Sequence, residues 1–214
     1  MTTRAWSFVG RLAALDLPRT FNPYRDRCAA FDVAEGAQVR QQNLALALEA
    51  ALSQKIDAIW IARDLGYRGG RRTGLALTDE YHLDDHARLL GCNPFSRATR
   101  GEAAPERTAK VIWASLNRVS RPTFLWNVFP LHPHHEHNPH SNRCHTRAEA
   151  EVARPFLQDL LDLMEPRNVI AIGRDAQSAL ARMNIKAIGV RHPSYGGEQE
   201  FREGIARYYG LGPE

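Results

Sequence analysis

Residues 124–133 read FLWNVFPLHP, an apolar run that carries Asn127 near its end and is followed by two prolines. Because proline has no N–H for a sheet ladder, this pattern predicts a buried strand that stops soon after Asn127. Open α/β sheets bind their ligands outside the carboxyl ends of their strands. Asn127 is therefore either a ligand-contacting amide or the residue that caps a turn.

Three further stretches are short, apolar and rich in β-branched residues, as expected for strands that are covered on both faces. They are residues 56–62, 169–173 and 185–190. Apolar side chains recur at helical spacing elsewhere, which predicts helices over residues 3–15, 36–54, 105–117, 148–164, 176–183 and 200–208, with another helix start at 77–80. This alternation predicts an α/β fold, a three-layer α/β/α arrangement with a central four-stranded, mainly parallel sheet, formed by a single domain over residues 1–214.

The chain has 214 residues and a formal charge of +4, and all but three of its 28 basic residues are arginine. Arginine forks match phosphate oxygens and stack on bases, so this balance agrees with a nucleic-acid partner, although biased codon usage would also replace lysine by arginine. Cys28, Cys92 and Cys144 are too few and too widely spaced for a thiolate-held iron-sulfur cluster. No apolar run has the length of a membrane span. We therefore expect a cytoplasmic monomer that uses no metal, no cofactor and no membrane.

The predicted strand at 56–62 is followed by the segment RDLGYRGGRRTG, residues 63–74. So many glycines and arginines predict a flexible, electropositive loop whose backbone amides can approach an anion. The segment is not a P-loop, since only three residues separate Gly66 from Gly70. Asp64 is the one acid among these arginines, and it is either a functional carboxylate or an anchor for one of them.

Histidines cluster in two places. His82 and His86 lie four residues apart, a spacing that could hold a metal, but we favour a solvated helix face because no third ligand is marked. Residues 131–145 contain six of the nine histidines, with a spacing that matches no closed metal site. We expect this histidine-rich segment to contact a phosphate backbone rather than a metal.

Polar side chains stand at the carboxyl ends of three predicted strands. They are Asp64, Asn127 and, after residues 185–190, His192. Because the carboxyl ends of parallel strands meet at one edge of a sheet, we expect these three side chains to share a site.

These strand ends resemble the uracil-DNA glycosylase superfamily. Residues 62–66, ARDLG, stand where that superfamily has Gly-Gln-Asp-Pro-Tyr-His or Gly-Glu-x-Pro-Gly. Residues 74–78, GLALT, look like its Gly-Leu-Ala-Phe-Ser, with Leu77 in place of the Phe that stacks on the extruded base. Residues 125–128, LWNV, match its uracil-reading strand, and residues 192–194 match its His-Pro-Ser motif. The chain looks like a divergent member without the cysteines of the iron-sulfur branches.

The resemblance implies a DNA-repair enzyme that flips uracil out of DNA and hydrolyses its N-glycosidic bond, which releases free uracil and leaves an abasic site. It implies that Asp64 positions water, that Asn127 reads uracil and that His192 stabilises the negative charge at uracil O2. Further substrate contacts are expected from Arg63, Gly66, Tyr67 and Leu77. Contacts to DNA are expected from Arg71, Arg72, His132, His145, Arg191, Ser194, Gly196 and Tyr195, the last as a wedge that fills the vacated stack.

Two alternatives remain open. One relative in this superfamily binds uracil-DNA covalently through a loop histidine, and residues 143–145, RCH, are similar to the Arg-x-His of that loop. The chain would then be a uracil-DNA binding protein that forms a tight or covalent complex through His145. The same scaffold also suits a nucleotide-binding or metal-dependent hydrolase, since a fold does not fix a function.

Overall fold

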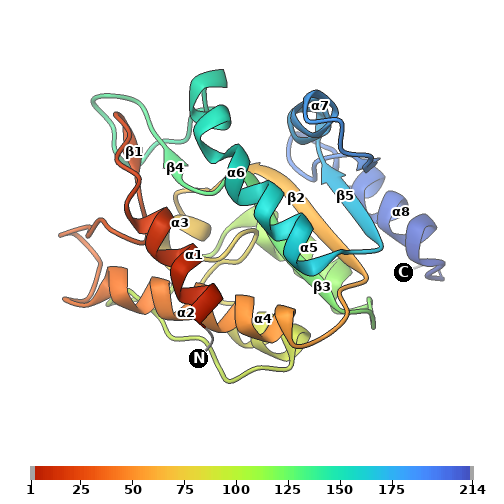
Figure 1. Ribbon diagram of the computed structural model, residues 1–214, viewed down its shortest axis with the longest axis horizontal. Coiled ribbons are helices and arrows are strands. Elements are labelled where there is room, and N and C mark those ends of the chain that lie inside the picture. The colour runs from red at the N-terminus through yellow and green to blue at the C-terminus, as the bar shows by residue number, and fades with distance from the viewer. Residues whose placement is uncertain (1–2, 213–214) are drawn as a thin grey trace.

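The computed structural model describes residues 3–212 and contains a four-stranded sheet in the order β3-β2-β5-β6, in which neighbouring strands are parallel (Figure 1). The strands are β2 (Ala58–Asp64), β3 (Thr123–Phe129), β5 (Asn168–Ile172) and β6 (Ile188–Val190). These are the four strands predicted from the sequence, although β2 extends to Asp64 and β6 begins at Ile188 rather than at residue 185. The predicted fold class is confirmed.

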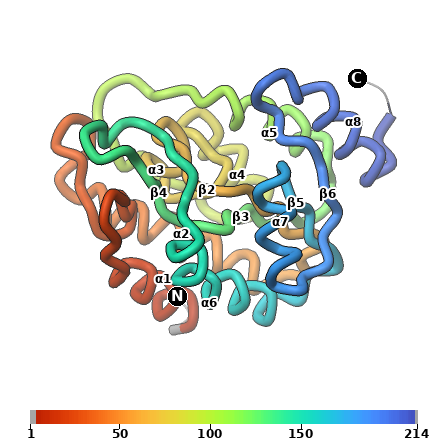
Figure 2. The backbone as a smooth tube through the Cα atoms, turned by 90° about the horizontal axis from the view of Figure 1, so that it is seen from above, coloured from red at the N-terminus to blue at the C-terminus, as the bar shows by residue number. Residues whose placement is uncertain are grey.

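Helices cover both faces of this sheet, as Figure 2 shows from above. The helices of the first face are α1 (Thr3–Ala13), α2 (Gly36–Leu52), α4 (Leu83–Leu90), α6 (Arg147–Met164) and α7 (Arg174–Arg182). Those of the second face are α5 (Arg107–Leu116) and α8 (Glu198–Tyr209). Along β2, Ile59 and Ile61 belong to the first core and Trp60 to the second. One nearly continuous apolar strand supplies both cores, because strand side chains alternate between faces.

A second, two-stranded sheet was not predicted. In it β1 (Thr20–Phe21) pairs antiparallel with β4 (His132–Pro133), which joins the N-terminal segment to the histidine-rich segment. Two-residue strands carry almost no periodic signal, so only the folded chain reveals the pairing. Within residues 3–212, no helix is both long enough and apolar enough to cross a membrane.

Three local predictions were wrong. The glycine- and arginine-rich loop contains a short helix, α3 (Gly70–Thr73), whose residues are all buried. The helix expected to start at 77–80 begins only at Leu83. His86 does not lie on a solvated face: it is 1% exposed, its Nδ1 hydrogen-bonds the hydroxyl of Thr78 at 2.9 Å, and its ring packs on Trp113 with the centroids 5.3 Å apart. Burial in this apolar setting lowers the pKa of His86 to about 3.

Candidate active site

A cavity of about 550 Å³ opens at the carboxyl ends of β2, β5 and β6. Its walls include Asp64 from β2, His192 after β6, Leu77 after α3, and Glu106 just before α5. This is the edge at which open α/β sheets bind ligands, and the volume suits a nucleotide-sized group.

Asp64 is the last residue of β2, and its side chain is 6% exposed. One carboxylate oxygen accepts a hydrogen bond from Arg63 Nε at 2.6 Å, and the other is bonded to His145 Nδ1. Arg63 also pairs with Asp175, at 2.6 Å between Nη1 and Oδ2. Two neighbours therefore fix the orientation of the carboxylate. Because each carboxylate oxygen has two lone pairs, acceptor capacity remains for a further donor.

His192 follows β6, which is one edge strand of the sheet, whereas Asn127 lies on β3, the other edge strand. The backbone N–H of Ser194 donates to His192 Nδ1 at 3.1 Å, so Nδ1 carries no proton and the neutral ring has its proton on Nε2. Burial, together with the positive charges of Arg63 and Arg191, lowers the pKa of His192 below its usual value. Near neutral pH the cavity therefore contains an uncharged imidazole with an Nε2–H donor. Gly173, at φ +86°, permits this close packing, because a Cβ there would lie 3.0 Å from the Cβ of His192.

Asn127 is 1% exposed and lies beside Ala62 in the β2–β3 register. Strand alternation places its side chain on the sheet face of Leu125, in the core that also contains Ala62 and Leu77. Neither Oδ1 nor Nδ2 has a hydrogen-bond partner among the described residues. The structure thus brings Asp64 and His192 into one cavity, while Asn127 lies next to the cavity-lining Ala62 without lining the cavity itself.

Leu77 has a left-handed backbone at φ +55°, a conformation that is strained for a branched side chain. Its carbonyl accepts the indole N–H of Trp113 at 3.1 Å, which ties this segment to α5. The side chain is 8% exposed and forms part of the cavity wall. A strained apolar residue therefore stands where the sequence predicts a base-contacting side chain.

A family model described as the uracil DNA glycosylase superfamily matches residues 70–206. The chain belongs to this superfamily. Among solved structures, the crystal structure of wild-type SMUG2 from Pedobacter heparinus is similar, with a TM-score of 0.65 and 14% sequence identity over 98% of this chain and 97% of that one. No curated protein sequence matches the chain. Asn127 and His192 fall inside the matched range of the superfamily model, whereas Asp64 precedes it.

Not every residue predicted to contact DNA lies at the cavity of this superfamily member. Arg191, Ser194 and Tyr195 line it, and Tyr195 is 95% exposed. Gly196 follows with φ +78°, which gives this loop a sharp turn. His145 lies in an adjoining smaller cavity that Arg147 and Arg182 also line.

Three residues that the sequence predicts to contact DNA have buried side chains. Arg71 is 2% exposed, packs on Phe21 with its guanidinium carbon 4.1 Å from the ring centroid, and donates to the carbonyl of Pro139. Arg72 is 6% exposed and pairs with Glu80 at 2.9 Å. His132 is fully buried, and its Nε2 is bonded to the carbonyl of Ser141 at 2.9 Å. Their side chains hold loops together, a use that their charge alone does not reveal.

Of the remaining residues predicted to contact the substrate, two line the cavity and one does not. Arg63 and Gly66 line the cavity. Tyr67 does not line it: its ring stacks on His140 with the centroids 5.1 Å apart, and its N–H donates to Asn142 Oδ1 at 2.9 Å.

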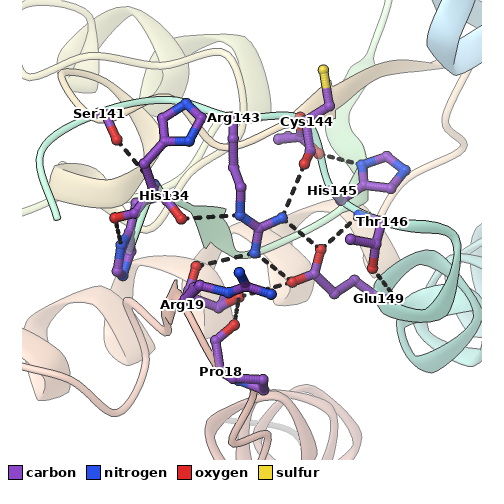
Figure 3. Close-up of polar contacts among 12 residues, drawn as sticks. Pro18, Arg19, His134, Ser141, Arg143, Cys144, His145, Thr146 and Glu149 are labelled. Atoms are coloured by element: carbon purple, nitrogen blue, oxygen red, sulfur yellow. Dashed lines mark hydrogen bonds and ion pairs between the residues drawn. The ribbon is translucent and has the colours of Figure 1, made fainter. Parts of the chain in front are cut away.

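Arg143 organises the histidine-rich segment, as Figure 3 shows. Its guanidinium donates to the carbonyls of His134, Cys144 and Arg19, and bidentately to the carboxylate of Glu149, at 2.6 and 2.8 Å. Thr146 and Glu149 form a capping box at the start of α6. These contacts set the position of His145 against Asp64. Among the described residues, no group of three or more His, Cys, Asp or Glu side chains could hold a metal.

Glu106 also lies at the site, although the sequence did not predict it. Its carboxyl group lies in the cavity wall beside Gly66 and Gly69, and its backbone N–H donates to Asp79 Oδ2 at 2.7 Å. Burial, reinforced by the nearby charge of Asp79, raises the pKa of Glu106 to about 7. In the sequence, Glu106 is simply an acidic residue at the start of a predicted helix. Such a residue normally indicates a helix N-cap rather than a functional site.

Proposed function

We propose that this protein is a uracil-DNA glycosylase of base excision repair, which hydrolyses the bond between uracil and deoxyribose and leaves an abasic site. Membership of the superfamily supports the broader class, a DNA glycosylase of repair. The observation that carries the finer proposal is a single cavity with the Asp64 carboxylate on one wall and the neutral imidazole of His192 on another.

In the proposed reaction, DNA presents a uracil nucleotide extruded from the stack, because the glycosidic bond inside a duplex cannot be reached. As that bond breaks, negative charge grows on uracil O2. The Nε2–H of His192 donates a hydrogen bond to this oxygen. A neutral donor suffices, and its pre-set tautomer avoids a reorganisation cost during the reaction.

Asp64 acts at the sugar. Its carboxylate orients a water molecule toward C1′ and stabilises the positive charge that develops on the deoxyribose ring. The bonds from Arg63 and His145 hold the carboxylate in place, and its free lone pairs accept from the water. The reaction consumes one water and releases free uracil.

Asn127 reads the base in this proposal. Its amide oxygen accepts from uracil N3–H and its nitrogen donates to O4, a pattern that cytosine reverses. The two unpartnered atoms of Asn127 support this role, since a bound uracil supplies the partners that the protein lacks. The base must extend past Ala62 to make these contacts.

Contacts to the DNA around the flipped nucleotide come from the exposed rim. In this proposal Arg191 and Ser194 bind phosphate and Tyr195 fills the gap in the base stack. Their position in the cavity wall and the exposure of Tyr195 support these roles. We propose that the protein acts on this DNA as a monomer.

The second candidate function is covalent capture of uracil-DNA by His145. The bond between His145 and Asp64 favours it, because this imidazole adjoins the carboxylate proposed to act at C1′. In that case an imidazole nitrogen bonds to C1′ as uracil leaves with the glycosidic electron pair. A protein–DNA band that survives denaturant and disappears in His145→Ala would favour capture over turnover.

The decisive experiment incubates purified protein with a labelled oligonucleotide containing one uracil, cleaves abasic sites with alkali, and quantifies the free base. Strand cleavage together with stoichiometric uracil release is expected, with no cleavage of the matched thymine oligonucleotide. An intact uracil strand at enzyme excess would refute the proposal. Addition of a chelator separates this activity from a metal-dependent hydrolase.

A further inference from the structure

Glu106 supplies a carboxyl group to the cavity wall, which Asp64 and Asp175 also line. It stands just before α5, and the loop between β2 and α3 folds over it. A Cβ added at Gly66 would lie 2.1 Å from Glu106 Oε1, and one at Gly69 would lie 2.2 Å from Oε2. The two glycines of this loop therefore leave the space that the carboxyl group occupies.

No described residue donates a hydrogen bond to this carboxyl group or forms an ion pair with it. The bond to Asp79 uses the backbone N–H of Glu106 and not its side chain. The residue is half-buried and lines the cavity, so a bound ligand can supply the hydrogen bonds that the chain does not. The raised pKa agrees with this setting, because it leaves a large fraction of the group uncharged near neutral pH.

Glu106 shares its cavity with a residue that is expected to contact the base. Leu77, at the position that the superfamily uses for base stacking, lines the same cavity and is tied to α5 through Trp113. Glu106 immediately precedes that helix. Asp64, by contrast, is bonded to both Arg63 and His145.

We propose that Glu106 is a base-recognising residue, which as a neutral carboxylic acid donates its O–H to O4 of the flipped uracil. This rests on the proposed glycosylase function. Asn127 uses the N3–H and one lone pair of O4, and the second lone pair of O4 remains for a further donor. Glu106 thus supplements Asn127.

The test compares Glu106→Gln with Glu106→Ala, and uses Glu102→Ala, an exposed acid earlier in the same segment, as the control. An amide keeps both a donor and an acceptor, so Glu106→Gln should retain single-turnover uracil release within about threefold. Glu106→Ala should lose about tenfold or more. Glu102→Ala should match the wild type. Melting curves identify any variant that is not folded.

A second readout is calorimetric binding of free uracil, which should weaken about tenfold in Glu106→Ala and little in Glu106→Gln. If Glu106→Gln is as inactive as Glu106→Ala, the group acts as a proton acceptor and the proposal is overturned. Equal uracil binding by the wild type and Glu106→Ala overturns it as well. If the wild type releases no uracil from DNA, the proposed function fails, and the binding of free uracil then tests Glu106 by itself.

Discussion

Asn43 in α2 and Asn127 in β3 are both buried amides, 3% and 1% exposed, in two regions of the molecule. Asn43 uses both of its polar atoms: Nδ2 donates to the carbonyls of Thr73 and Ser96, at 3.2 and 2.8 Å, and Oδ1 accepts the N–H of Ser96 at 3.0 Å. Asn127 uses neither.

An unsatisfied buried polar group costs roughly 1–3 kcal/mol, so the amide of Asn127 weakens the fold, whereas that of Asn43 ties α2 to α3 and to the loop at Ser96. The cost occurs near the carboxyl end of β3, two residues before the strand ends, and next to the cavity-lining Ala62. We therefore interpret Asn43 as a structural residue, and we propose that the substrate is the hydrogen-bond partner of Asn127. The two residues also provide matched variants, because the same amide can be removed from either region.

The largest effect is expected from Asp64→Asn, which tests whether the site beside Asn127 is catalytic. Asp64→Asn should slow single-turnover uracil release by roughly 10²–10⁴-fold, because Asp64 acts mainly in the transition state. Binding of uracil-DNA should change little. Asp159→Asn, on α6 and paired with Arg11, is the control and should keep the wild-type rate. An unchanged rate in Asp64→Asn would remove Asp64 from the mechanism.

The comparison of the two amides is tested directly by Asn127→Ala and Asn43→Ala. Asn127→Ala should lower uracil release roughly 5- to 150-fold, since the base loses two hydrogen bonds. Asn43→Ala should keep the rate of the folded enzyme and lower the melting temperature more, because it leaves groups of Thr73 and Ser96 without partners. The opposite ranking of the two melting temperatures would show that Asn127 is structural.

A third effect concerns Glu149, a buried acid whose partners are all supplied by the chain. Although burial opposes it, hydrogen bonds from Arg143 and Thr146 lower the pKa of Glu149 from 4.5 to about 2. A lowered folded pKa stabilises the protein above pH 4.5, and this contribution is lost as the pH falls toward 2. Thermal melts over that range should show a loss of several degrees that Glu149→Gln reduces. Parallel profiles for both proteins would contradict the assignment.

The smallest effect is expected at Tyr195, the exposed residue of the rim. Tyr195→Ala should reduce activity on duplex uracil-DNA a few-fold and leave activity on single strands unchanged, because only a duplex has a stack to refill. Equal losses on both substrates would point to a contact with the nucleotide itself. Full activity on the duplex would end the wedge assignment.

The sequence predicted the fold class and the superfamily well, because both depend on local patterns. Apolar runs such as residues 56–62 and 124–129 specify strands by composition alone, and helical periodicity specifies the layers between them. The motifs around Asp64, Asn127 and His192 kept their order along the chain, which was enough to place Asp64 and His192 at the same sheet edge.

Side chains whose use depends on distant neighbours could not be predicted. Arg71 and Arg72 have the sequence signature of an anion-binding loop, yet both side chains are buried in the protein. Arg71 packs on the ring of Phe21, which is distant in the sequence, and Arg72 forms an ion pair with Glu80. The histidines of residues 131–145 similarly suggested a phosphate site. In the structure, His132 and Arg143 instead form hydrogen bonds to backbone carbonyls within this segment.

What the sequence by itself determined is a parallel α/β sheet of the uracil-DNA glycosylase superfamily, with polar side chains at three strand ends. The tertiary structure alone decided which polar groups are satisfied and which are not. It paired Asp64 with Arg63 and His145, set the protonated nitrogen of His192 through Ser194, and left the amide of Asn127 without a partner among the described residues. The physical reason is that burial and hydrogen bonding are properties of packing, which brings together residues that no local pattern in the chain connects.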